Sequence, residues 1–198
     1  MVTNWPAGQR VVFGGDYNPE QWPRTTWEED VALMREAGVN FVSIGMWAWS
    51  LLEPSEGNYN FEDYDHLINL LHDNGIAVDL GTPSASPPSW FYHKYPGARV
   101  VHRDGTVVTN GSRGAAAPTS PQYREAAAKI AGKLAERYAD HPGVVMWHIH
   151  NEYGAPVSHD YSDNARRAWP LWLQERYGTL DELFEALTLA QTRKVHSF

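Results

Sequence analysis

Short apolar runs alternate with helix-forming segments along the whole of this 198-residue chain. The apolar runs expected to form strands cover residues 10–15, 39–47, 76–83 and 144–152. The helical patterns, in which apolar residues recur three or four positions apart, cover residues 25–38, 61–75, 121–141 and 164–186. Pro170 is expected to kink the last helical region or to start its second part. Four strand–helix repeats predict an α/β fold built on a parallel sheet.

Two folds of this kind are open, a doubly wound sheet and a TIM (β/α)8 barrel. A dinucleotide-binding sheet has a Gly-x-Gly-x-x-Gly turn after its first strand, and FGGDYNPEQ (13–21) does not contain one. Polar residues instead follow the predicted strands: Asp16 and Asn18, Thr82 and Ser84, Asn151 and Glu152. Because active sites of TIM barrels lie at that edge, this pattern favours the barrel. Four units make only about half of one.

The composition excludes several classes of protein. The formal net charge of −8 argues against a nucleic-acid partner, and the absence of cysteine excludes disulfides and thiolate metal sites. The first residues lack the pattern of a secretory signal, and no apolar run approaches the roughly 20 residues of a membrane-spanning helix. We therefore expect a soluble, cytoplasmic protein without a membrane partner.

The stretch HIHNEYG (148–154) has three readings. Its polar groups could simply satisfy loop amides where the fourth strand ends. Alternatively, His148 and His150 would point to one face of a regular strand together with Glu152 and could bind a metal ion, although two histidines are a weak signal.

The third reading is acid/base catalysis by Glu152. Desolvation disfavours the charged form of a carboxyl group at an apolar strand end among tryptophans. Such a group can donate a proton to the departing oxygen of a glycosidic bond. The amide of Asn151 can donate to and accept from a sugar hydroxyl at the same time.

Several motifs together resemble glycoside hydrolase family 42, the β-galactosidases. They are GGDYNPEQWP (14–23), WSLLEPSEGNYNFEDYD (49–65), SASPPSW (84–90), GSR (111–113) and HNEYG (150–154). The resemblance implies a TIM barrel of the retaining glycosidase clan, of which this chain holds about the first four β/α units. It also implies hydrolysis of terminal non-reducing β-D-galactose residues from β-D-galactosides, with no cofactor.

The same resemblance assigns roles to three residues. It implies that Glu152 is the proton donor and base, and that Arg113 and Asn151 bind galactose. Without it, Arg113 would read as a loop arginine that pairs with nearby acids. For Trp47, Trp49 and Trp90, core packing is the first expectation and stacking on a sugar ring the second.

The chain departs from the family in two ways. Many members bind a structural zinc through cysteines, whereas the corresponding stretches here, GAAAPTSP (114–121) and APVSHDYSDN (155–164), have none. The family's nucleophile is a glutamate at the end of the seventh strand, so it falls outside this chain. We assign that role to none of the acids near the predicted strand ends, which are Asp16, Glu53 and Asp79.

We therefore predict that residues 1–186 form the first half of a barrel. Residues 187–198 are expected to be a non-matching tail, disordered or frame-shifted, as in a truncated product. The chain alone is expected to be inactive. Its open strand edges predict that it either associates, for example as a homo-oligomer, or stays partly molten. The resemblance adds that family members are often trimers. A non-catalytic sugar-binding remnant and a metal-dependent hydrolase that uses His148 and His150 are the alternative functions.

Overall fold

The structure is a computed structural model that describes residues 11–195, with the side chains of residues 11–188. Its centre is one parallel sheet with the strand order β1-β2-β3-β4. The strands are β1 (Gly14–Asp16), β2 (Phe41–Ile44), β3 (Ala77–Gly81) and β4 (Val144–His148). The predicted α/β class and parallel sheet are confirmed. Arg10, the first residue of the first predicted strand, lies outside the described residues.

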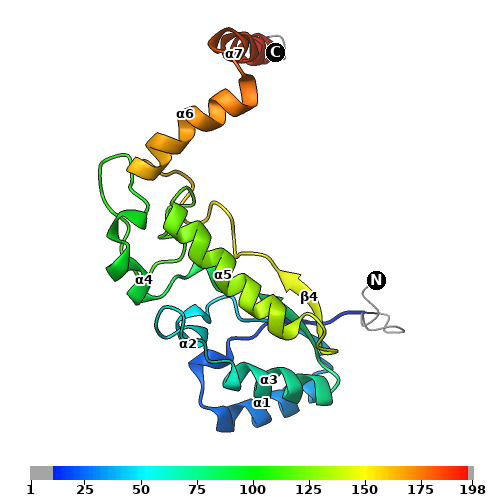
Figure 1. Ribbon diagram of the computed structural model, residues 1–198. Helices are drawn as coiled ribbons and strands as arrows, with labels where there is room; N and C mark the ends of the chain where they lie inside the picture. Colours follow the sequence, from blue (N-terminus) through cyan, green and yellow to red (C-terminus); the bar gives the residue numbers. More distant parts are fainter. Residues whose placement is uncertain (1–10, 196–198) are drawn as a thin grey trace.

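Each crossover between neighbouring strands carries a long helix, as expected of parallel β-α-β units. These helices are α1 (Arg24–Glu36), α3 (Glu62–Asp73) and α5 (Pro121–Tyr138). Figure 1 shows α1 and α3 side by side, with α5 beyond them along the sheet. All three agree with the predicted helices to within a few residues.

The main core lies between the sheet and these helices. Alternate residues of the strands pack against helix residues that are spaced three or four positions apart. The buried residues of this core, each at most 2% exposed, include Val42, Ile44, Leu67, Ile68, Leu71, Val78, Leu80, Ile130 and Leu134. Burial of one such side chain contributes about 2 kcal/mol. This core fixes the strands, and so fixes where their carboxyl ends lie.

The remaining elements before β4 are short and lie in the loops. They are α2 (Trp49–Leu52), α4 (Ser89–Lys94) and three 3₁₀ turns, η1 (Pro19–Gln21), η2 (Pro83–Ala85) and η3 (Pro96–Ala98). The loop that carries α4 is tied to itself by two isolated bridges, Arg99 with Ala116 and Val101 with Val107.

Two helices follow β4, α6 (Asp163–Tyr177) and α7 (Leu180–Val195), and they extend away from the sheet (Figure 1). The expectation for Pro170 is corrected in one respect, because Pro170 lies inside α6 and no second part starts there. The break falls at Gly178, whose φ of 74° belongs to the left-handed region that glycine tolerates. The expected boundary at Ala186 lies within α7 and stays a prediction, and residues 196–198 lie outside the described residues.

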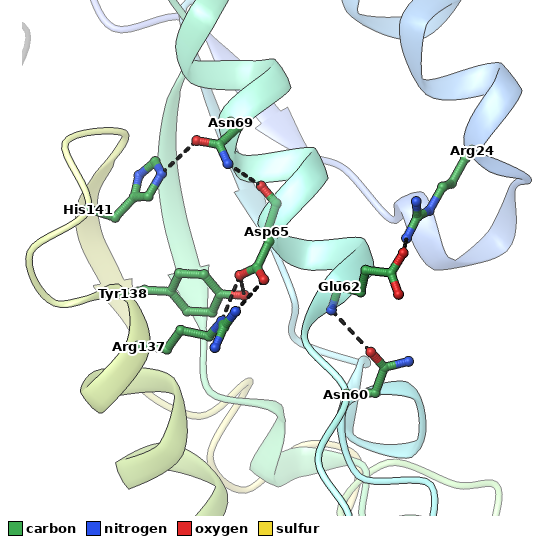
Figure 2. Close-up of polar contacts among 8 residues, drawn as sticks. All are labelled: Arg24, Asn60, Glu62, Asp65, Asn69, Arg137, Tyr138 and His141. Carbon is green, nitrogen blue, oxygen red and sulfur yellow. Dashed lines mark hydrogen bonds and ion pairs between the residues drawn. The ribbon is translucent and has the colours of Figure 1, made fainter.

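A polar cluster joins α3 to α5 near the amino-terminal end of β4. We call it the α3–α5 cluster, and it consists of Asp65, Asn69, Arg137, Tyr138 and His141 (Figure 2). The Arg137 guanidinium donates to both carboxylate oxygens of Asp65, with Nε 2.7 Å from Oδ1, and Tyr138 Oη donates to Oδ1 at 2.9 Å. The His141 ring binds the Asn69 amide oxygen at 3.2 Å.

No helix in the part of the chain that the structure describes is long and apolar enough to cross a membrane.

Candidate active site

The strand β4 ends at His148, and the backbone then leaves the extended conformation twice. His150 has a φ of 56° and Glu152 a φ of 50°. Residues with a side chain rarely adopt this left-handed conformation, and each instance costs on the order of 1–2 kcal/mol. The chain therefore turns sharply on either side of Asn151, although its sequence reads as a continued strand.

This turn removes the geometric basis of the metal reading. His148, His150 and Glu152 share a face only on a regular strand, and the strand does not reach the last two. Within residues 11–195, no three histidines, aspartates or glutamates lie in positions to hold one metal ion. Instead, the Nδ1 atom of His148 lies 3.8 Å from the buried carboxylate of Asp79.

His150 is held by groups from the loop after β3. Its backbone N–H donates to Thr82 Oγ1 at 2.9 Å, and its Nδ1 atom lies 2.9 Å from Ser84 Oγ. The ring also stacks on Tyr153, with the centroids 4.4 Å apart. Burial, and then the nearby His148, lower the pKa of His150, so its imidazole is neutral at neutral pH. We call Thr82, Ser84 and His150 the His150 clamp.

Glu152 pairs with Arg113 across a gap of 39 positions in the sequence. Glu152 Oε2 lies 2.5 Å from Arg113 Nη1, and both side chains are about half exposed, at 50% and 43%. The sequence predicted both as site residues, and the structure brings them together. The shielding from water that we expected for Glu152 is not present in this chain, since half of its side chain is in solvent.

The other predicted site residue, Asn151, is half-buried between the two left-handed residues. Of the tryptophans, Trp49 is fully buried and donates to Glu53 Oε2 at 2.7 Å, while half-buried Trp90 donates to the Glu53 carbonyl at 2.8 Å. Among these three, Trp47 is the one beside Arg113, with its ring centroid 5.9 Å from Arg113 Cζ. Core packing therefore accounts for Trp49 and includes Trp90, and stacking of Trp47 on a sugar stays a prediction.

Each member of the ion pair lines a cavity. One of about 310 Å³ is lined by Trp47, Ser86, Pro87, Gly111, Ser112 and Arg113. The other, of about 820 Å³, includes Ser84, His150, Glu152 and Tyr153 in its lining. Both volumes suit a small-molecule ligand. Arg113 lines the first cavity and Glu152 the second.

Two of the three acids that we left unassigned, Glu53 and Asp79, have other partners, and the third, Asp16, is exposed at the end of β1. Glu53 is 4% exposed and accepts hydrogen bonds from Trp49 and from the Gly57 N–H. Asp79 is 5% exposed and accepts from Ser43 Oγ at 2.9 Å. The pairing of Asp79 with His148 was not expected from the sequence, because it joins side chains 69 positions apart.

Comparisons with known proteins agree on one family. Residues 16–192 match the model of glycoside hydrolase family 42, described as beta-galactosidase. A β-galactosidase from Arthrobacter sp. is 48% identical over 179 residues, and one from Heyndrickxia coagulans is 46% identical over 175. These alignments cover 90% and 88% of this chain but only 26% of each relative, so the chain spans about a quarter of the relatives' length.

Solved structures show the same relationship. A β-galactosidase from Bacillus circulans sp. alkalophilus superposes with a TM-score of 0.83 at 40% identity, over 91% of this chain and 26% of that one. For the enzyme from Rahnella sp. R3 the TM-score is 0.81 at 44% identity, over 89% and 26%. The four β/α units thus correspond to the N-terminal part of the TIM barrel in these structures.

Proposed function

This chain belongs to the β-galactosidases of glycoside hydrolase family 42, and from that membership we propose that it supplies the acid/base half of a retaining β-galactosidase. The substrate class is a β-D-galactoside with galactose at its non-reducing end. Glu152 is the proton donor in the first step and the base in the second. Arg113 and Asn151 bind the galactose unit.

The observation that carries this proposal is the Arg113–Glu152 ion pair at the carboxyl edge of the sheet. A retaining glycosidase needs a carboxyl group that protonates the leaving oxygen and later takes a proton from water. Arg113 pairs with this carboxylate and also lies over the Trp47 ring. A galactose unit that binds beside Trp47 would therefore compete with Glu152 for Arg113.

The reaction also needs a second carboxylate about 5 Å from the first, to attack the anomeric carbon. Within the described residues, Glu53 and Asp79 are committed to the contacts given above, so neither is available. We propose that the nucleophile comes from barrel strands outside these residues. A relative from G. stearothermophilus, 38% identical, has been studied as a catalytic mutant in which one glutamate is replaced by alanine.

The sheet itself supports the need for further barrel strands. Within residues 11–195, β1 and β4 are its two edges, and each leaves backbone groups on its outer side available for pairing. We propose that this 198-residue chain turns over galactosides negligibly and associates through these edges. A compact monomer on size-exclusion chromatography, or hydrolysis of a chromogenic β-galactoside at family rates, would contradict this.

The assignment of Glu152 is best tested in a barrel chimaera, in which residues 16–186 of this chain replace the matching segment of the Arthrobacter sp. β-galactosidase. We expect Glu152→Gln to lower kcat/KM for lactose by roughly 10²–10⁴-fold, the range that general acid catalysis supplies. Glu125→Gln, a carboxylate exposed on α5, is the matched control and should leave kcat/KM unchanged. Retention of lactose turnover by the Glu152 variant would refute the assignment.

A further inference from the structure

The left-handed conformations at His150 and Glu152 require groups that hold them in place. A residue with a side chain keeps such a φ only where surrounding contacts over-determine it. Glu152 lies within this turn and points toward Arg113, so we expect the groups that stabilise the turn to set the direction of the carboxylate as well.

The hydroxyl of Thr82 makes the contact that replaces the strand ladder where β4 ends. The Thr82 N–H donates to the His148 carbonyl at 2.9 Å, a regular contact between parallel strands. The next contact comes from the side chain instead, because Thr82 Oγ1 accepts from the His150 N–H at 2.9 Å and lies 3.4 Å from the His148 carbonyl. Thr82 is buried, so water does not compete for this position.

Ser84 fixes the ring of the same histidine and is itself fixed by α5. Its hydroxyl lies 2.9 Å from His150 Nδ1, and its carbonyl accepts from Tyr123 Oη at 2.9 Å. Burial raises the pKa of Tyr123 to about 12, so its hydroxyl stays protonated and keeps donating at any working pH. The His150 clamp is therefore anchored in the core through Tyr123.

We propose that Thr82, Ser84 and His150 are positioning residues that aim Glu152 for proton transfer to the leaving oxygen. This inference rests on the proposed role of Glu152 as the acid/base. We assign the clamp no contact with the reacting atoms. It holds the backbone turn, and the turn holds the carboxyl group within reach of the glycosidic oxygen.

The clamp predicts a particular kinetic signature. A misplaced acid slows only those bonds whose leaving group needs a proton, because a 2,4-dinitrophenolate departs without one. In the barrel chimaera, Thr82→Val keeps the size of the side chain and removes only the hydroxyl. We expect it to lower kcat/KM roughly 10–100-fold for methyl β-galactoside and less than about threefold for 2,4-dinitrophenyl β-galactoside.

A second signature comes from the deglycosylation step, where Glu152 acts as the base. Azide attacks the glycosyl-enzyme without needing a base, so it should raise kcat of the Thr82→Val variant on the dinitrophenyl substrate and leave the parent chimaera unaffected. Ser84→Ala should show the same pattern in weaker form. Thr82→Ser retains the hydroxyl and should restore the parent rates.

The matched control is Ser120→Ala, which removes a fully buried hydroxyl that caps α5. Any loss of activity that comes from lower stability should fall equally on both substrates in this variant. Suppose that Glu152→Ala shows the leaving-group dependence. Equal losses of kcat/KM on both substrates in Thr82→Val, or no loss at all, would then overturn the proposed role of the clamp. Absence of that dependence in Glu152→Ala itself would instead overturn the proposed role of Glu152.

A structural measurement in the 198-residue chain provides an independent check. The ¹³Cα and ¹³Cβ chemical shifts of His150 and Glu152 report whether their backbone is left-handed. We expect Thr82→Val to move both residues out of this conformation and Thr82→Ser to leave them in it. Unchanged shifts in the valine variant would show that the turn does not depend on the hydroxyl, and would overturn the proposal.

Discussion

The helices that cover the sheet bury their apolar side chains, whereas the two helices that follow β4 leave theirs in solvent. Leu67, Ile68 and Leu71 of α3 are 0% exposed, but Leu171 of α6 is 67% exposed and Phe184 of α7 is 62% exposed. Both groups have amphipathic sequences. The difference lies in the partners, because α3 packs on strands that are present, while among the described residues α6 and α7 contact chiefly each other.

This comparison shows how far the fold of the chain is self-contained. Three β-α units generate their own core, since each helix is followed by the strand on which it packs. The fourth unit would pack against a following strand, and no such strand exists within residues 11–195. The stacked pair Trp169 and Trp172, with ring centroids 5.2 Å apart, accordingly lies on an exposed face.

The largest expected effect separates the two regions directly. Leu67→Ala creates a cavity in the main core and should lower the free energy of unfolding by about 2–5 kcal/mol. The same substitution at Leu171 removes a side chain that is already in water and should change it by no more than about 0.5 kcal/mol. Urea denaturation followed by circular dichroism measures both. Equal losses would mean that α6 packs against the core in solution.

The sequence predicts the covered region well because its signals are local. Alternation of apolar runs and helical patterns located the four strands and their helices. The resemblance named Glu152, Asn151 and Arg113 as site residues, and their roles stay predictions. Such signals cannot reveal contacts between distant residues. The end of β4 at His148 was missed because a hydroxyl 68 positions away, on Thr82, replaces the strand ladder at His150. The helix break at Gly178 was missed because proline is the stronger local signal.

The stability of the region formed by the sheet and its covering helices should also depend on pH, because the α3–α5 cluster lies in this region and not in α6 or α7. His141 Nδ1 accepts from the Gly143 N–H at 3.0 Å, so its Nε2–H faces the Asn69 oxygen and the ring is neutral. Burial and then His72 lower the pKa of His141, and hydrogen bonds from Arg137, followed by Tyr138, lower the pKa of Asp65. A group with a lowered pKa stabilises the fold above its unfolded pKa, and this stability is lost as pH falls toward the folded value.

The covered region should therefore lose stability in two steps, the first below about pH 6.5 from His141 and the second below about pH 3.9 from Asp65. Because the Asp65 pair is about half exposed, its step is expected to be no more than about 1 kcal/mol. Urea titrations at a series of pH values measure both steps. His141→Asn should reduce the first step, to which His150 also contributes through its lowered pKa, and leave the second step unchanged. A first step of undiminished size in this variant would show that His141 does not contribute to it.

The smallest effect concerns the first turn of α7, which is held by a reciprocal cap. Thr179 Oγ1 accepts from the Glu182 N–H at 3.2 Å, and Glu182 Oε2 accepts from the Thr179 N–H at 2.8 Å. This capping box satisfies N–H groups that have no partner within the helix. Glu182→Ala should accelerate hydrogen exchange of the amides in the first turn of α7 several-fold, and leave the urea midpoint of the covered region unchanged. Thr179→Ala should give the same local result. A shift of the global midpoint in either variant would show that α7 is coupled to the sheet, and would remove the distinction between the two regions.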